Sequence, residues 1–333
     1  MKYGEGNRIG KQFGANSFRS RAPWWGGDLQ TLRNRIVRHE VSLPGLSKRL
    51  FLAMADGSGD QLAAMLHVPD NVTDSPLVVL IHGLTGSEDS DYLRQSAAFH
   101  LKRGYRVLRL NLRGAGPSRS SSGGQYHSGC ATDLRDALMA LDYDLTSQGV
   151  FLIGFSLGGN ILINLLAAHC TDLPVFGAVT VSAALDPAQA TKRIMAPRNV
   201  LYHRWLLRHM RRECLALGAR LEDQERHAIL RARTIYEFDN TFTAPRNGFS
   251  GADEYYTGTA GWRVAPKIVI PTLLIHARND PWIPSDPYEH IKQTAPTLRV
   301  NLVDGGGHVG FHGRGHDETW HDRCAGEFFD SLW

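Results

Sequence analysis

The chain has 333 residues, of which 42% are hydrophobic and 21% are charged, and its formal net charge is +4. These proportions are close to the averages of globular proteins, which excludes a disordered or fibrous class. The charge is small for this length, and no block of lysine and arginine interleaved with aromatic residues occurs, so we expect no nucleic-acid partner. The length suits one large α/β domain that carries an insertion as well as it suits two domains.

The first 21 residues are polar, with five basic residues and no apolar stretch, which is unlike a secretory signal or a membrane anchor. No apolar run approaches the roughly 18 residues that a membrane span needs. The four cysteines form no C-x-x-C pair, which argues against a disulfide framework, a redox motif or a zinc knuckle. They are Cys130, Cys170, Cys214 and Cys324. We therefore expect a cytoplasmic protein without a transmembrane segment.

Three short runs rich in apolar residues predict antiparallel strands at the start of a sheet. They cover residues 35–43, 49–54 and 61–67, and turn signals separate them. Six compact apolar runs then follow, of the kind found in strands that are buried on both faces. They cover residues 77–81, 105–110, 150–154, 175–181, 272–277 and 298–303.

Segments with helical spacing of apolar residues lie between these runs. They cover residues 92–103, 133–145, 157–169 and 287–292. Because strands and helices alternate, we expect an α/β fold with a mostly parallel, doubly wound sheet.

About eighty residues, 185–264, separate two of the predicted strands, where a simple crossover needs about a dozen. This stretch contains amphipathic segments and then an aromatic, turn-rich part. We expect it to form a cap that packs on the sheet, and also a lid whose apolar underside faces a substrate. Residues 1–333 then form a single domain with a lid at 185–264, and Tyr202, Trp205 and Phe249 are candidate substrate-binding residues.

A nucleophile elbow is predicted at residues 150–160, where an apolar run, a serine between glycines and a helical segment follow one another. The G-x-S-x-G pattern at 154–158 occurs once, and the similar run at 248–251 lacks both the second glycine and a preceding strand. The glycines leave room for a tight turn, and the start of the helix offers N–H groups to an anion. Ser156 is therefore the candidate nucleophile.

A serine nucleophile needs a histidine that accepts its proton and a carboxylate that orients this histidine. After a nucleophile elbow, the acid and then the histidine are expected on loops that follow later strands. Asp280 follows the run 272–277, and His308 follows the run 298–303, so both match in position and in order. The alternatives are His312 and His316 on the loop of His308, and Asp286 and Asp304 near the expected acid.

No metal or cofactor is expected. His308, His312 and His316 are spaced by four residues, as on one side of a helix, but glycines at 310, 313 and 315 argue against a helix there. The loop at 111–118 lacks both the G-x-G-x-x-G pattern and the lysine of a phosphate-binding loop. Arg113 in this loop is expected to form a structural ion pair.

An oxyanion hole requires two backbone N–H donors. The N–H of Leu157, directly after the serine, is one candidate. The other is expected in the loop that follows the run 77–81, where Leu84 is the first choice and Gly83 the alternative. His82 in this loop precedes the nucleophile and is expected to have a structural hydrogen-bonding role.

The chain resembles an α/β-hydrolase from about residue 35 to its end. The resemblance rests on the order of five features along the chain: the loops at 82–86 and 113–118, the nucleophile elbow, Asp280 and His308. Four further segments are similar to the YheT-like branch, which includes plant embryogenesis-associated proteins and eukaryotic abhydrolase relatives. They are Asp28–Leu32, His82–Gly86, Tyr126–Gly129 and the aromatic stretch 238–256. The resemblance implies a serine hydrolase of carboxylic esters, among relatives with esterase, monoacylglycerol or phospholipid lipase, and alcohol acyltransferase activities.

We therefore expect a carboxylesterase without a cofactor, whose partner is a small-molecule ester or a lipid. His308, oriented by Asp280, deprotonates Ser156, which attacks the ester carbonyl, and water then releases the acid. Two alternatives stay open: an acyltransferase that delivers the acyl group to an alcohol, and a non-catalytic homologue that binds a ligand in the same pocket.

Overall fold

One sheet of eight strands runs through the computed structural model, which describes residues 18–333 except 38–40, 73 and 296. The strands are β1 (Leu46–Ala53), β2 (Gln61–Val68), β3 (Leu77–Ile81), β4 (Val107–Leu110), β5 (Val150–Phe155), β6 (Val175–Val181), β7 (Thr272–Ala277) and β8 (Arg299–Val303). Their order across the sheet is β1-β2-β4-β3-β5-β6-β7-β8. β1, β2 and β4 pair antiparallel, and all pairs from β4 to β8 are parallel. The predicted mostly parallel sheet with antiparallel N-terminal strands is confirmed.

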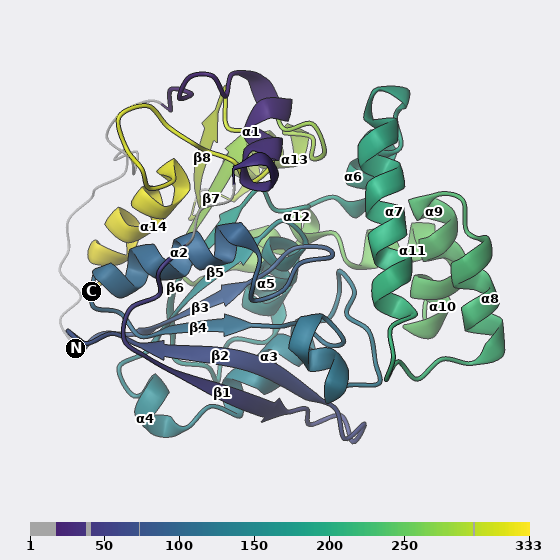
Figure 1. Ribbon diagram of the computed structural model, residues 1–333, viewed down its shortest axis with the longest axis horizontal. Coiled ribbons are helices and arrows are strands. Elements are labelled where there is room, and N and C mark those ends of the chain that lie inside the picture. Colours follow the sequence, from purple (N-terminus) through teal and green to yellow (C-terminus); the bar gives the residue numbers. More distant parts are fainter. Residues whose placement is uncertain (1–17, 38–40, 73, 296) are drawn as a thin grey trace.

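Helices cover both faces of the sheet (Figure 1). On one face, α2 (Asp91–Lys102) and α14 (Trp320–Asp330) share an apolar cluster with the strands. On the other, α3 (Ala131–Met139), α5 (Leu157–Ala168) and α13 (Asp286–Thr294) do the same. Every residue of β3 and β5 is buried, as expected for central strands between two helical layers. The ends of these strands therefore sit on a rigid base.

Between β6 and β7 the chain leaves the sheet and forms a series of helices. They are α6 (Pro187–Ile194), η2 (Pro197–Asn199), α7 (Val200–Cys214), α8 (Asp223–Arg231), α9 (Ile235–Phe238), the π-helical turn η3 (Asp239–Thr243), α10 (Ala244–Arg246), α11 (Ala252–Gly258), α12 (Gly261–Val264) and η4 (Ala265–Lys267). We call α6 to α11 the helical insertion. It lies to one side of the sheet (Figure 1) and contains apolar clusters of its own.

Three further short elements complete the described chain: α1 (Gly26–Ile36), η1 (Gly116–Ser120) and α4 (Tyr143–Thr146). The strand predicted at 35–43 is wrong, because residues 35 and 36 end α1 and residues 41–43 belong to no strand, while 38–40 lie outside the described residues. The buried side chains of α1, Gln30 and Arg33, are polar, so no apolar periodicity marks this helix. The helix predicted at 133–145 is two helices, α3 and α4.

Within the described ranges, no helix combines the length and the apolar composition that crossing a bilayer requires. Residues 1–17, which carry most of the N-terminal segment considered above, lie outside these ranges. All four cysteines are buried free thiols.

Candidate active site

Ser156 occupies the turn between β5 and α5 in a strained conformation. Its backbone angles are φ 52° and ψ −120°, a combination that non-glycine residues rarely adopt. The turn is also tightly packed, because a Cβ atom on Gly158 would lie 2.3 Å from the carbonyl oxygen of His82. The sequence therefore needs glycine at 158, and the side chain of Ser156 is presented at the end of a buried strand.

Three side chains from separate loops form one hydrogen-bonded chain. The Ser156 Oγ lies 2.9 Å from His308 Nε2, and His308 Nδ1 lies 2.8 Å from Asp280 Oδ2. The second oxygen of Asp280 accepts hydrogen bonds from the backbone N–H groups of Trp282 (2.8 Å) and Ile283 (3.0 Å). Both oxygens of this buried carboxylate therefore have partners.

The electrostatics of the pair favour an ionised Asp280. Complete burial by itself would raise the pKa of Asp280, but the charge and the hydrogen bond of His308 and the N–H of Ile283 hold it below its ordinary value. An ionised Asp280 accepts the Nδ1 proton of His308, which leaves the Nε2 lone pair directed at the hydroxyl of Ser156. This arrangement can remove a proton from Ser156 and later return one.

The loop after β3 lies against the turn that carries Ser156. A Cβ atom on Gly83 would come 2.9 Å from the Cβ of Ser156, so only glycine allows this approach. The Gly83 N–H donates to Tyr92 Oη at 3.0 Å, and the Thr85 N–H donates to Tyr126 Oη at 2.7 Å. Between them, the Leu84 N–H donates to no acceptor among the described residues. Of the two predicted donors in this loop, Leu84 is therefore the available one.

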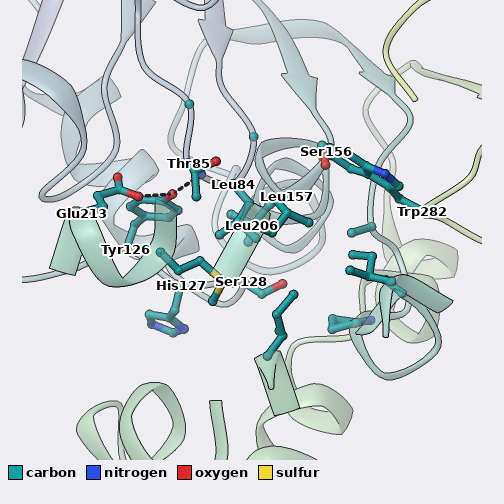
Figure 2. Close-up of a pocket in the computed structure, with 18 of the residues that line it drawn as sticks. Leu84, Thr85, Tyr126, His127, Ser128, Ser156, Leu157, Leu206, Glu213 and Trp282 are labelled. Atoms are coloured by element: carbon teal, nitrogen blue, oxygen red, sulfur yellow. Dashed lines mark hydrogen bonds between the residues drawn. The ribbon is translucent and has the colours of Figure 1, made fainter. Parts of the chain in front are cut away.

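Leu157 is the first residue of α5, and the N–H groups in the first turn of a helix have no acceptor within the helix. Its N–H and that of Leu84 are thus two backbone donors on neighbouring segments beside Ser156. Figure 2 shows both leucines next to each other, with Ser156 on one side and the loop residue Thr85 on the other.

A cavity of about 440 Å³ extends from these residues under the helical insertion. Near Ser156 its wall includes Leu84, Leu157 and Trp282, and α7 adds Leu206 and Glu213 (Figure 2). The wall is therefore mostly apolar close to the nucleophile, which suits an acyl chain or another apolar group.

Two carboxyl groups of the helical insertion also line this cavity. Burial raises the pKa of Glu213 to about 7, against a hydrogen bond from Tyr126 and the charge of Arg119. Burial also raises the pKa of Asp239 to about 6, although Tyr256 Oη donates to its carboxylate at 2.7 Å. Both groups are therefore easier to protonate than ordinary surface carboxylates.

The sequence model of the α/β-hydrolase fold matches residues 76–314, well over half of the chain. The chain belongs to the α/β-hydrolase family. This hydrolase is 31% identical over 298 residues to "Putative esterase YheT" of Escherichia coli (strain K12), covering 88% of this chain and 86% of that protein. The predicted resemblance to the YheT-like branch is thereby confirmed.

The hydrolase is also similar to a monoacylglycerol lipase of Saccharomyces cerevisiae, at 28% identity over 262 residues, which cover 74% of this chain and 57% of the lipase. Among solved structures, the Pyrococcus furiosus esterase Pf2001 superposes with a TM-score of 0.57 at 19% identity, over 86% of this chain and 93% of that chain. At such low identity the superposition shows the shared fold alone.

Of the three residues predicted to bind substrate in this hydrolase, Trp205 lines the cavity. Tyr202 and Phe249 are not part of its wall. The Tyr202 hydroxyl donates to Asp28 at 3.1 Å, and the ring of Phe249 packs against Tyr255. Tyr202 and Trp205 lie on α7, and amphipathic spacing does not tell which side of that helix faces the cavity. Phe249 lies in the loop between α10 and α11.

The alternative histidines and acids lie away from Ser156. The backbone N–H and carbonyl of His312 bond to Gln30, and His316 is exposed. Asp286 is exposed at the start of α13, and Asp304 is exposed and pairs with Arg278. The structure therefore brings Asp280 and His308 to the serine and not these four residues.

Two neighbouring residues have the structural roles that were predicted. His82 is completely buried, which lowers its pKa to about 4, and it bonds to the carbonyl of Gly83 and to the N–H of Leu112. Arg113 forms ion pairs with three aspartates, Asp56, Asp60 and Asp133. In the part of the chain that the structure describes, no group of three or more histidine, cysteine or acidic side chains could hold a metal ion.

Several residues around the site were not predicted. On α1, the Thr31 hydroxyl oxygen accepts a hydrogen bond from the His308 N–H, and Gln30 holds residue 312 of the same loop. Tyr92 and Tyr126 hold the loop of Leu84. The sequence offered one hint of these residues, namely the resemblance of the segments Asp28–Leu32 and Tyr126–Gly129 to those of relatives. Their contacts are long-range, so the sequence did not show what they do.

Proposed function

We propose that this hydrolase is a serine carboxylesterase that cleaves short- to medium-chain acyl esters or monoacylglycerol-like lipids through an acyl-enzyme on Ser156. The observation that carries the proposal is the continuous hydrogen-bonded chain from Ser156 through His308 to Asp280, beside a cavity that has apolar side chains near the serine. The names of the esterase and lipase relatives support an ester as the substrate class.

The proposed reaction has two halves. His308 Nε2 takes the proton of Ser156 while Oγ forms a bond to the ester carbonyl carbon, and the N–H groups of Leu84 and Leu157 stabilise the resulting oxyanion. The tetrahedral intermediate collapses, the alkoxide leaves with the proton from His308, and Ser156 keeps the acyl group. Water, deprotonated by His308, then attacks the acyl-enzyme. The bond from the acyl carbon to Ser156 Oγ breaks, His308 returns the proton to Oγ, and the acid is released. Asp280 orients His308 and stabilises its charged form throughout.

We further propose that the segment 185–264 acts as a lid of a single domain and that the protein is cytoplasmic. The first of these rests on the position of α7, η3 and α9, whose side chains form part of the cavity wall beyond Ser156. A covering of this kind excludes water from part of the site and selects substrates by shape.

Labelling with a fluorophosphonate probe tests the nucleophile. The wild type should be labelled and Ser156→Ala should not, while Ser250→Ala, at the exposed serine of the second glycine-flanked run, should be labelled like the wild type. Equal labelling of Ser156→Ala and the wild type would refute the proposal, because the reactive residue would then be another one. A wild type that the probe does not label would instead favour a non-catalytic, ligand-binding protein.

Product analysis separates hydrolysis from acyl transfer. An ester incubated with the enzyme and ethanol should give the free acid, because water is the proposed acceptor. An ethyl ester as the main product would instead show an alcohol acyltransferase that uses the same acyl-enzyme.

A further inference from the structure

Two tyrosine hydroxyl groups hold the residues on either side of Leu84. Tyr92 Oη accepts the N–H of Gly83, and Tyr126 Oη accepts the N–H of Thr85. The carbonyl oxygen of Gly83 is held as well, because it bonds to His82 Nδ1 at 2.8 Å and accepts the Gly86 N–H at 3.1 Å. This carbonyl shares one planar trans peptide group with the Leu84 N–H, so the N–H points the opposite way. Its direction is therefore set by the bonds of its neighbours.

Thr85 is the part of the loop that most needs support. Its φ is +57°, in the left-handed region, which is unfavourable for a residue with a Cβ atom. The hydrogen bond to Tyr126 Oη, at 2.7 Å, fixes the peptide group between Leu84 and Thr85 in this conformation. Without this acceptor, the loop can relax and turn the Leu84 N–H away from Ser156.

Tyr126 is itself held in place. Its backbone N–H bonds to the carbonyl of Arg113, and its ring packs edge-on against His82 with centroids 5.7 Å apart. A tyrosine hydroxyl has a single proton, and the oxygen already accepts the Thr85 N–H, so this proton goes to another acceptor. That acceptor is Glu213 Oε2, at 3.1 Å. Figure 2 shows the two hydrogen bonds in sequence, from Glu213 through Tyr126 to Thr85. We call them the tyrosine hydrogen-bond chain.

Glu213 belongs to the last turn of α7, in the helical insertion. The tyrosine hydrogen-bond chain therefore joins the insertion to the loop after β3. Tyr126 and Glu213 are 87 residues apart in the sequence. The carboxylate of Glu213 also strengthens the hydrogen bond between Tyr126 and Thr85. A hydroxyl that donates to a carboxylate becomes a better acceptor, here for the Thr85 N–H.

We propose that Glu213 is a positioning residue that acts through Tyr126 to hold the oxyanion-hole donor of Leu84, so that the helical insertion supports the chemical step as well as covering the cavity. This inference rests on the proposed function. It predicts that loss of the acceptor at 213 lowers the stabilisation of the oxyanion more than it weakens the binding of the substrate.

The test compares Glu213→Met, Glu213→Gln and Tyr126→Phe with the wild type in hydrolysis of a p-nitrophenyl ester. Methionine fills the space of glutamate but accepts no strong hydrogen bond, whereas glutamine keeps an acceptor oxygen. We expect Glu213→Met and Tyr126→Phe to lower kcat by about tenfold with KM changed by less than about twofold, and Glu213→Gln to retain most of the activity.

Two further readouts exclude a merely structural effect. The affinity for a trifluoromethyl ketone, which forms a tetrahedral oxyanion on the serine, should fall by the same factor as kcat. The double variant Tyr126→Phe with Glu213→Met should be no slower than Tyr126→Phe alone, because both changes interrupt the same tyrosine hydrogen-bond chain. Tyr236→Phe is the control, since this half-exposed tyrosine also donates to a carboxylate of the insertion, at Asp253, but does not line the cavity.

Wild-type kcat in Glu213→Met would overturn the inference, as would additive losses in the double variant or a change confined to KM. If Tyr126→Phe does not fold, the comparison of Glu213→Met with Glu213→Gln decides alone. Failure of this inference is distinct from failure of the proposed function, because the latter is shown by activity that survives in Ser156→Ala.

Discussion

The hydroxyl oxygen of Thr31 on α1 accepts a hydrogen bond from the backbone N–H of His308, with 2.8 Å between the two heavy atoms. The same hydroxyl donates to the carbonyl of Gly27 at 2.7 Å. A helix near the start of the chain therefore fixes the loop that presents the histidine, almost three hundred residues later.

Thr31→Val removes both hydrogen bonds but keeps the shape of the side chain. The His308 N–H loses its acceptor, so we expect a loss of about 1 kcal/mol in the free energy of unfolding and a fall of about threefold to tenfold in kcat. Urea unfolding and steady-state kinetics measure the two effects. Thr294→Val, at an exposed threonine that bonds within its own helix, is the control and should change neither quantity. Unchanged kcat in Thr31→Val would contradict a role of α1 in placing His308.

Asp280→Asn should be the most damaging change that leaves the serine and the histidine in place. An amide cannot stabilise the charged ring of His308 and favours the wrong tautomer, so kcat should fall by roughly 10³- to 10⁴-fold while the thermal stability changes little by comparison. Asp286→Asn, at the exposed alternative acid on α13, should retain wild-type kcat. Similar losses in the two variants would mean that the acid has been misassigned.

Trp205 and Tyr202 neighbour each other on α7, but only Trp205 lines the cavity. Its ring also lies under the guanidinium of Arg35, 3.8 Å from the ring centroid. Trp205→Ala removes a large apolar surface, so KM for a medium-chain ester should rise by roughly 5- to 20-fold. Tyr202→Phe removes only a hydroxyl that bonds to Asp28 outside the cavity and should leave KM unchanged. A KM series over acyl chain lengths checks this, and equal effects of both variants would refute the assignment.

The carboxyl group of Asp239 gives the stability a predictable pH dependence. Burial raises its pKa from 3.8 to about 6, opposed by hydrogen bonds from Tyr256 and Thr243. Tyr255 and Cys214 are the other titratable groups that sense its charge. Between these pH values the folded state holds a proton that the unfolded state has lost, so the free energy of unfolding falls as the pH rises.

Asp239→Asn abolishes this contribution. The Tm of the variant minus that of the wild type should therefore increase from about pH 4 to about pH 6 and stay constant above. Thermal unfolding of both proteins over this range is the measurement. A difference that does not change with pH would show that Asp239 keeps an ordinary pKa in the fold.

Much of the sheet could be predicted from the sequence because the central strands are buried on both faces. The boundaries of β3, β6 and β7 agree with the predicted runs, since strands between two helical layers are made mostly of apolar residues. α1 escaped notice, and part of it was read as a strand, because its buried side chains are the polar Gln30 and Arg33. A helix that is fixed by hydrogen bonds leaves no periodic apolar pattern.

The sequence by itself determined the order of the chemistry: a serine in a strand-to-helix turn, then an acid and a histidine after later strands. These are local signals, since glycine spacing and apolar runs act within a few residues of the chain. Only the tertiary structure decided which of several histidines and acids meets Ser156, which face of α7 lines the cavity, and how Glu213, Tyr126 and Thr85 come into line. Each of these depends on contacts between segments far apart in sequence, whose geometry is set by the packing of the whole fold.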